Sequence, residues 1–373
     1  MTKEPRRSAG LTRNKAAPTR IAFLAITQAH QFLHWLPSAL RLAREPGVEV
    51  TVLGSSRAGL DFVRSYDPDR LLRLKQLVVP SLSPDGLFTP PKRRLSLLLN
   101  QHIIRRFPTI VTTETTSSIL KQLPGFRSRL ILIKHGAGDR EGSYNPKHAF
   151  FDRILVNGEK HRQELLNRGL AHPERIIVTG NAKLELVRPP APIFADPKPL
   201  ALYNPHFDPE LSSWFRHGQE IVDEMERIKD WNFVVAPHVK LKGGPDVRST
   251  AANILIDRGS VRSIDMSYTQ ASDVYIGDVS SQVYEFALKP RPCIFLNFDH
   301  RDWQNDDSYA HWRLGQVIER IDELAPALER AQSLQPKFEK GQRRMAEYSI
   351  ARAAEPASER QARAILAFAR GEG

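Results

Sequence analysis

The sequence predicts an α/β protein built from two Rossmann-like domains that face each other across a cleft. With 373 residues, the chain is longer than a single domain usually is. Short apolar runs alternate with amphipathic segments, which is the pattern of a parallel sheet flanked by helices. A proline-rich segment at residues 188–199 interrupts this alternation, which then starts again.

Six apolar runs in the first half of the chain are predicted strands. They cover residues 21–26, 48–54, 109–112, 129–134, 153–157 and 175–179. The amphipathic segments 36–45 and 159–169 fit helices between these strands. We therefore predict an N-terminal Rossmann-like domain over residues 19–187, preceded by a disordered basic leader at residues 1–18.

The second half repeats this organisation after the proline-rich segment. Proline fixes φ and removes a backbone donor, so the five prolines within residues 188–199 predict an interdomain linker. The predicted strands are 200–204, 232–236, 273–277 and 292–296, with helices at 210–228 and 280–288. We expect a second Rossmann-like domain over residues 200–322. The remaining residues, 323–373, are expected to form helices that pack across both domains.

The composition limits the class of protein. Hydrophobic residues make up 41% of the chain, which is enough to build packed cores and excludes a disordered protein. The one cysteine, Cys293, excludes an internal disulfide and lies in an apolar run typical of core packing. No apolar stretch approaches the ~20 residues that cross a bilayer. The run at 21–26 is too short for a signal peptide, so we predict a cytoplasmic protein.

The chain is strongly basic, with a formal net charge of +12 and a pI near 9.8. Such a charge fits nucleic acid, an anionic membrane surface or anionic small-molecule substrates. The basic residues are spread along the chain, and no motif that reads RNA or DNA accompanies them. We therefore expect a phosphorylated substrate and peripheral contact with the inner face of the cell membrane, and no nucleic acid. Ordinary solvated surface charge is the alternative.

One segment with the chemistry of an anion site lies at the end of a predicted strand. This strand ends at Asp278, and Ser280 and Ser281 then open a predicted helix. The unpaired N–H groups and the positive dipole end of a helix attract anions, and a pair of hydroxyls beside them can hold a diphosphate. Simple capping of the helix by Ser280 explains the same pattern without a ligand.

Two further strand ends deliver a histidine to the expected cleft. His135 follows the strand at 129–134, and Gly136 beside it lets a ligand approach the backbone. A histidine at this place suits general-base work on an acceptor hydroxyl, although an inert loop histidine has the same signature. His238 and Lys240 follow the strand at 232–236 and can neutralise charge on a leaving phosphate; a solvated surface loop is the alternative.

Weaker candidates lie elsewhere. His30 and His34 follow the first predicted strand, where a structural role is the alternative to contact with an acceptor. Arg140 and Lys183 are expected near the cleft. The run at 305–307 contains two aspartates but follows no strand, so we expect a solvated loop there and no metal site.

At these positions the chain resembles a known family. Asp278-Val279-Ser280-Ser281, with the runs at 284–288 and 292–296, resembles the C-terminal signature of CDP-glycerol glycerophosphotransferases, the wall-teichoic-acid type of enzyme with a GT-B fold. Lys134-His135-Gly136 is similar to the family's Trp-His-Gly motif, and Pro237-His238 to its second histidine motif. His206 lies where the family has its first C-domain loop. The resemblance covers roughly residues 125–300.

The resemblance implies a set of roles. His135 is the expected base, His238 contacts the phosphate or the leaving group, and Ser280 and Ser281 hold the donor phosphates. Lys240 is expected to join these phosphate ligands because of its charge. Further candidates for substrate contact are Gly136, Arg140, Asp278, His206 and His30. The resemblance implies no cofactor and no metal. Its implied donor is a CDP-linked alcohol in the C-terminal domain, and the acceptor in the N-terminal domain is a polyol phosphate, a glycan or a lipid.

Two alternatives stay open from the sequence. A GT-B glycosyltransferase uses a nucleotide sugar and releases a nucleoside diphosphate, whereas transfer of glycerophosphate releases a monophosphate. A non-catalytic nucleotide-binding component of an envelope assembly complex is the second alternative, and its function would survive the loss of His135.

Overall fold

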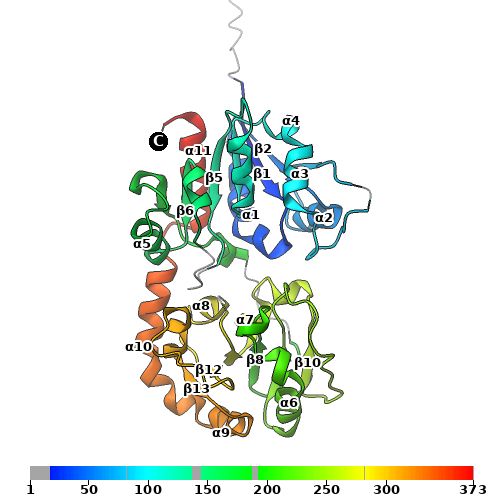
Figure 1. Ribbon diagram of the computed structural model, residues 1–373, viewed down its shortest axis with the longest axis vertical. Helices are drawn as coiled ribbons and strands as arrows, with labels where there is room; N and C mark the ends of the chain where they lie inside the picture. Colours follow the sequence, from blue (N-terminus) through cyan, green and yellow to red (C-terminus); the bar gives the residue numbers. More distant parts are fainter. Residues whose placement is uncertain (1–16, 81, 137–143, 187–191, 281, 373) are drawn as a thin grey trace, which may run out of the picture.

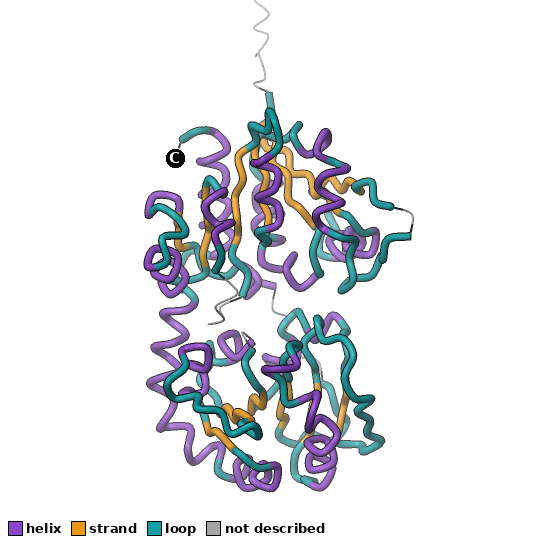
Figure 2. The backbone as a smooth tube through the Cα atoms, viewed as in Figure 1, coloured by secondary structure: helices purple, strands orange, loops and turns teal. Residues whose placement is uncertain are grey.

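Two all-parallel sheets organise the chain, one in each half (Figure 1). This computed structural model describes residues 17–80, 82–136, 144–186, 192–280 and 282–372. Helices cover both faces of each sheet, and loops connect the helices to the two ends of the strands (Figure 2). Each half is therefore a three-layer α/β unit.

The first sheet draws its strands from residues 19–178. Its strands are β1 (Thr19–Ala25), β2 (Val48–Gly54), β3 (Arg73–Gln76), β4 (Thr109–Thr112), β5 (Arg129–Ile133), β6 (Arg153–Val156) and β7 (Ile176–Val178). They lie in the order β3-β2-β1-β4-β5-β6-β7, so the order reverses between β1 and β4. The flanking α-helices are α1 (Leu36–Ala43), α2 (Arg57–Ser65), α3 (Arg93–Leu99), α4 (Gln101–Ile104) and α5 (Glu159–Asn167).

The second sheet draws its strands from residues 200–318. Its strands are β8 (Leu200–Asn204), β9 (Asn232–Val235), β10 (Ile254–Ile256), β11 (Val274–Gly277), β12 (Cys293–Leu296) and β13 (Gln316–Ile318). The order is β10-β9-β8-β11-β12-β13, with the reversal between β8 and β11. The helices of this half are α6 (Trp214–Arg227), α7 (Ser267–Ala271), α8 (Gln282–Phe286) and α9 (Leu324–Glu329).

The central strands are buried on both faces, as parallel strands between two helical layers must be. In β1, Ile21 and Phe23 pack toward α1, whereas Ala22 and Leu24 pack into the core on the opposite face. This alternation follows the two-residue period of a strand. Cys293 of β12 is buried, and burial raises the pKa of its thiol to about 12, which agrees with a packing role.

The last two helices connect the two halves. Helix α10 (Ala331–Ser349) runs along the second sheet and reaches α5 of the first half (Figure 1). A Cβ at Gly158 would lie 2.5 Å from the backbone of Ser349, so the end of α10 requires glycine there. Helix α11 (Ala357–Arg370) then packs against α1, where the Ser38 hydroxyl donates to Gln361 at 2.6 Å.

Several predicted bounds were wrong. The sequence patterns missed the edge strands β3, β10 and β13. The helix predicted at 210–228 begins at Trp214, after a 3-10 turn at Pro209–Leu211. The helix predicted at 280–288 spans only Gln282–Phe286. None of the helices that the structure describes is long and apolar enough to span a bilayer.

Candidate functional site

A pocket of about 150 Å³ lies between the carboxyl-end loops of the two sheets. Both halves of the chain line it, close to the points where the strand order of each sheet reverses. In open α/β sheets these reversal points are where ligands bind. Six of the residues that line it are histidines: His30, His34, His135, His206, His238 and His311. We call it the histidine pocket.

The loop after β5 holds His135 in one tautomer. Its Nδ1 lies 2.7 Å from the carbonyl oxygen of Thr113, which can only accept a hydrogen bond, so Nδ1 carries the proton and Nε2 the lone pair. Burial, together with the charges of Lys240 and Lys134, lowers the pKa of His135 to about 3. The ring is therefore neutral near pH 7, with Nε2 able to take a proton.

The same loop begins with a backbone conformation that favours glycine. Gly136 has a φ of +70°, and its carbonyl accepts a 2.7 Å hydrogen bond from the side chain of Asn157. Gly136 lines the histidine pocket beside His135. Glycine at this position therefore sets the direction in which the chain leaves the histidine.

The 3-10 segment Ala29–His34 after β1 contributes two more histidines. His34 donates from Nδ1 to the side-chain oxygen of Asn181 at 3.0 Å, and its ring centroid is 6.2 Å from that of His135. The ring of His30 lies 5.9 Å from that of His238, and its Nδ1 is buried without a partner in the described part of the chain. Burial holds the pKa of both histidines well below the ordinary value.

His206 and His238 follow strands of the second sheet and have the opposite tautomer. Nδ1 of His206 accepts from the backbone N–H of Asp208 at 3.1 Å, and Nδ1 of His238 accepts from the N–H of Lys240 at 3.1 Å. In the neutral rings the proton is therefore on Nε2, which makes it a hydrogen-bond donor. The pocket thus combines the Nε2 lone pair of His135, from the first half of the chain, with the Nε2–H donors of His206 and His238 from the second half.

Ser280 lies at the entrance to the short helix α8. Its hydroxyl donates to the side-chain oxygen of Asn204 at 3.0 Å and accepts from the backbone N–H of Gln282 at 3.3 Å. Ser280 lines the histidine pocket, so the capping role and the pocket position coincide. Ser281 and Arg140 lie outside the described residues.

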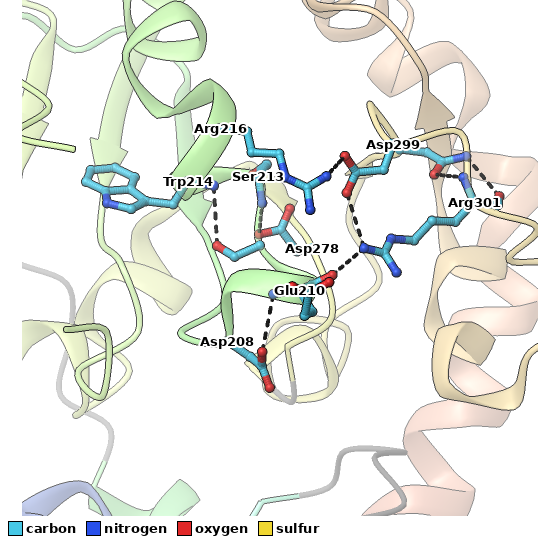
Figure 3. A network of polar contacts seen from close by, with 10 residues as sticks. Asp208, Glu210, Ser213, Trp214, Arg216, Asp278, Asp299 and Arg301 are labelled. Carbon is cyan, nitrogen blue, oxygen red and sulfur yellow. Dashed lines mark hydrogen bonds and ion pairs between the residues drawn. The ribbon is translucent and has the colours of Figure 1, made fainter. Parts of the chain in front are cut away.

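Asp278 organises the loops behind the histidine pocket and is absent from its lining. Its carboxylate accepts from the backbone N–H groups of His206 and Ser213, both at 3.1 Å, and Figure 3 shows the Ser213 contact. Its carbonyl accepts from Nε2 of His311 at 3.1 Å. Burial raises the pKa of Asp278 to about 6. In this geometry Asp278 positions two pocket histidines.

The charged residues of the pocket are mainly cationic. Lys240 lines it, with its Nζ 5.4 Å from the centroid of the Phe207 ring. Lys183 and Glu285 form a 2.7 Å ion pair across the two halves, and both side chains are less than 10% exposed. An excess of positive charge in a partly closed site favours an anionic ligand. Within the described residues, no three His, Cys, Asp or Glu side chains converge as metal ligands do.

The structure brings most of the predicted site residues into one pocket. These are His30, His135, Gly136, His206, His238, Lys240 and Ser280. The sequence patterns missed His311 and Glu285, because neither follows the end of a strand. His311 lies in the 3-10 segment Asp307–Leu314, and Glu285 lies inside α8.

The sequence of the second half of the chain matches a known protein family. Residues 214–366 match the model of the family described as CDP-glycerol:poly(glycerophosphate) glycerophosphotransferase. The resemblance to this family is therefore confirmed over the second histidine motif and the C-terminal signature, and the match does not extend to His135. The match also confirms the predicted class of enzyme, a glycerophosphotransferase-like transferase. No protein with a curated description matches the chain.

Solved structures confirm the GT-B fold. The wall teichoic acid polymerase TagF is similar with a TM-score of 0.65 and 13% identity, over 95% of this chain and 90% of that one. The UDP-GlcNAc 2-epimerase from Neisseria meningitidis is similar with a TM-score of 0.63 and 13% identity, over 93% and 99% of the two chains. The calicheamicin glycosyltransferase CalG4 has a TM-score of 0.56 and 13% identity, over 94% and 98%.

Proposed function

We propose that the protein transfers a glycerophosphate-type group from a CDP-linked alcohol to an acceptor hydroxyl in the synthesis of a cell-envelope polymer or lipid. In this reaction the acceptor oxygen forms a bond to the phosphorus next to the alcohol. The bond from that phosphorus to the oxygen of the CMP phosphate breaks, and CMP leaves. The observation that carries the proposal is the pairing of opposite histidine tautomers in one cationic pocket.

His135 is the base in this proposal. Its Nε2 lone pair takes the proton of the acceptor hydroxyl while the bond from oxygen to phosphorus forms. The carbonyl of Thr113 fixes the ring, so the lone pair keeps its direction through the reaction. The bound diphosphate adds negative charge beside the ring, which raises the pKa of His135 and makes it a stronger base.

The second half of the chain binds the donor in this proposal. The Nε2–H groups of His206 and His238 suit phosphate oxygens, and Lys240 adds a positive charge beside them. As CMP leaves, charge builds on its phosphate, and His238 stabilises that charge by hydrogen bonding. Ser280 adds a hydroxyl, and we assign the same role to Ser281.

Titration calorimetry tests the choice of donor. We expect the protein to bind CDP-glycerol and CDP more tightly than UDP or a UDP-sugar. Lys240→Ala is expected to weaken the binding of CDP-glycerol at least tenfold. Arg57→Ala, an exposed change far along the chain, is the matched control and leaves binding unchanged. Tighter binding of a UDP-sugar would instead favour glycosyl transfer, and no binding of any nucleotide would favour a non-catalytic role.

We propose further that the protein works at the inner, cytoplasmic face of the cell membrane. Five large apolar side chains are exposed on α3 and the loop before it: Val78, Leu82, Leu95, Leu98 and Leu99. Lys92, Arg105 and Arg106, close to them in the sequence, are also exposed. Leucines flanked by cations suit an anionic lipid surface, where each cation contributes about 1 kcal/mol.

Sedimentation with vesicles tests the membrane contact. We expect binding to vesicles rich in phosphatidylglycerol and little binding to vesicles of phosphatidylcholine alone. Leu98→Ser/Leu99→Ser is expected to reduce binding severalfold, whereas the exposed Val261→Ser, in the other half of the chain, leaves it unchanged. Equal binding by the two variants would refute the assignment of this surface.

A further inference from the structure

His34 lies beside the base His135 in the histidine pocket, and the proposed reaction leaves it without a role. It ends the 3-10 segment Ala29–His34 and is only 4% exposed, although its ring lines the pocket. Its ring centroid is 6.2 Å from that of His135, on the same half of the chain. A buried polar ring so close to the base is placed to contact the reacting molecules.

Two hydrogen bonds to one oxygen fix the tautomer of His34. The backbone N–H of Lys183 donates to Oδ1 of Asn181 at 3.1 Å, and a backbone N–H can only donate. The same oxygen is 3.0 Å from Nδ1 of His34, so Nδ1 carries the proton and Nε2 carries the lone pair. His34 therefore has the same tautomer that the carbonyl of Thr113 gives to His135.

The lone pair of His34 is left for a ligand. Asn181 lies outside the lining of the pocket, so Nδ1 points away from the pocket and Nε2 is the ring nitrogen on its side. Among the residues that the structure describes, none donates a hydrogen bond to Nε2. A polar atom of a buried side chain that lacks a partner points to a missing ligand or water.

The surroundings of His34 decide which chemical group suits this lone pair. Burial, with the charge of Lys183, holds the pKa of His34 well below its ordinary value, so Nε2 remains an acceptor near pH 7. A phosphate oxygen would set one lone pair against another, whereas His206 and His238 offer it Nε2–H donors. An ammonium group would meet the same burial and the same charge that keep the ring neutral. A neutral hydroxyl meets neither obstacle.

We infer that His34 is a specificity residue whose Nε2 accepts a hydrogen bond from a substrate hydroxyl that does not react. Nε2 of His135 meanwhile takes the proton of the hydroxyl that attacks. Rings 6.2 Å apart can hold two neighbouring hydroxyls, each about 2.8 Å from its ring nitrogen. Two sources supply the second hydroxyl: the alcohol of the donor, and the acceptor beside its attacking oxygen. The inference rests on the proposed function and adds the residue that requires a polyol.

Steady-state kinetics with deoxy analogues tests the inference. The donors are CDP-glycerol and CDP-propanol, which lacks both free hydroxyls, and the acceptors are glycerol 3-phosphate and 3-hydroxypropyl phosphate, which lacks the 2-hydroxyl. We expect kcat/KM for one hydroxyl-bearing substrate to exceed that for its analogue by about tenfold or more, because the analogue leaves Nε2 of His34 unpaired. The pair that shows this preference identifies the source. Equal use of both members of both pairs would overturn the inference and leave the transferase function intact.

Variants of His34 show whether this residue causes the preference. In His34→Asn the amide nitrogen still donates to Asn181 but nothing replaces Nε2, so the preference is expected to fall to within twofold. His34→Gln brings an amide oxygen near the position of Nε2 and is expected to keep part of it. His172→Asn, the same change at an exposed histidine outside the pocket, is the matched control and keeps the full preference.

A purely structural role of His34 gives a different result from a contact with substrate. It would lower kcat/KM equally for both members of a pair in His34→Asn, with their ratio unchanged, and that result would overturn the inference. Failure of the wild type to turn over CDP-glycerol with either acceptor would overturn the proposed function, and the inference with it.

Discussion

Substitutions of His135 can distinguish its role in catalysis from its role in stability. In the proposed reaction Nε2 accepts the proton of the acceptor, whereas Nδ1 donates a hydrogen bond to the carbonyl of Thr113. In His135→Asn, the amide nitrogen takes the place of Nδ1 and still donates to the carbonyl of Thr113, but nothing replaces the Nε2 lone pair. In His135→Ala, both are lost. We expect the two variants to lose activity equally and to differ in stability.

The magnitudes follow from the geometry. Loss of a general base lowers kcat by about 10²–10⁴-fold, or about 3–5 kcal/mol of transition-state stabilisation. Thr113 is 1% exposed, so removal of the His135 donor leaves its carbonyl unsatisfied in the interior. That costs about 1–3 kcal/mol of the free energy of unfolding in His135→Ala, and less in His135→Asn.

The assays are CMP release from CDP-glycerol in the presence of acceptor, and unfolding in urea. CDP-glycerol binding, measured by calorimetry, should stay within threefold of the wild type in His135→Asn. A variant His135→Asn that retains more than a tenth of the wild-type kcat would refute the role of His135 as base. Equal stability of the two variants would refute the Thr113 anchor.

Four further outcomes are expected for His135, for the Lys183–Glu285 pair and for Asp278. Burial holds the pKa of His135 at about 3, so protonation of this base causes no loss of kcat/KM between pH 8 and pH 5 in a pH–rate profile. The pKa of Asp278 is about 6, so a loss centred near pH 6.5 contradicts this only if it persists in Asp278→Asn. Below about pH 6.5 the same histidine takes up a proton when the protein unfolds. The free energy of unfolding therefore falls as the pH drops from about 6.5 toward 3. Urea titrations should show a smaller fall in His135→Asn. Lys183→Met leaves the buried carboxylate of Glu285 unpaired and is expected to lower the free energy of unfolding, measured in urea, by about 3–5 kcal/mol. Adding Glu285→Gln should restore part of this loss. No destabilisation would mean that the pair does not form. Asp278→Asn weakens the hydrogen bonds that hold the loop of His206, and we expect a higher KM for CDP-glycerol with kcat reduced less; an unchanged KM would contradict the positioning role.

The central strands and the edge strand β7 were predictable from the sequence, whereas the edge strands β3, β10 and β13 were not. Strands such as β1 and β11 are buried on both faces, so they appear in the sequence as continuous apolar runs. Strand β3 has the sequence Arg-Leu-Lys-Gln, and three of its four residues are exposed. Strands β10 and β13 are three residues long. Short, partly exposed edges carry too little hydrophobic pattern to be distinguished from loops.

The site was predictable where residues directly follow strands. His135 and His238 come at the ends of β5 and β9, and parallel strands bring their carboxyl ends to one edge. The pairing of Lys183 with Glu285 joins residues 102 positions apart, and no local pattern indicates it. The tautomers of the histidines depend on hydrogen bonds such as the one from His135 to Thr113, which only the folded chain shows.

The most direct test of the proposed reaction is the identity of the nucleotide that a single turnover releases. The wild-type protein, in excess over CDP-glycerol, is mixed with glycerol 3-phosphate or with vesicles that contain phosphatidylglycerol, and the products are separated and followed by ³¹P NMR. We expect CMP and a new phosphodiester in equal amounts, and formation of both slowed by about a hundredfold or more with His135→Asn. Release of CDP, or turnover of UDP-sugars in place of CDP-glycerol, would contradict it.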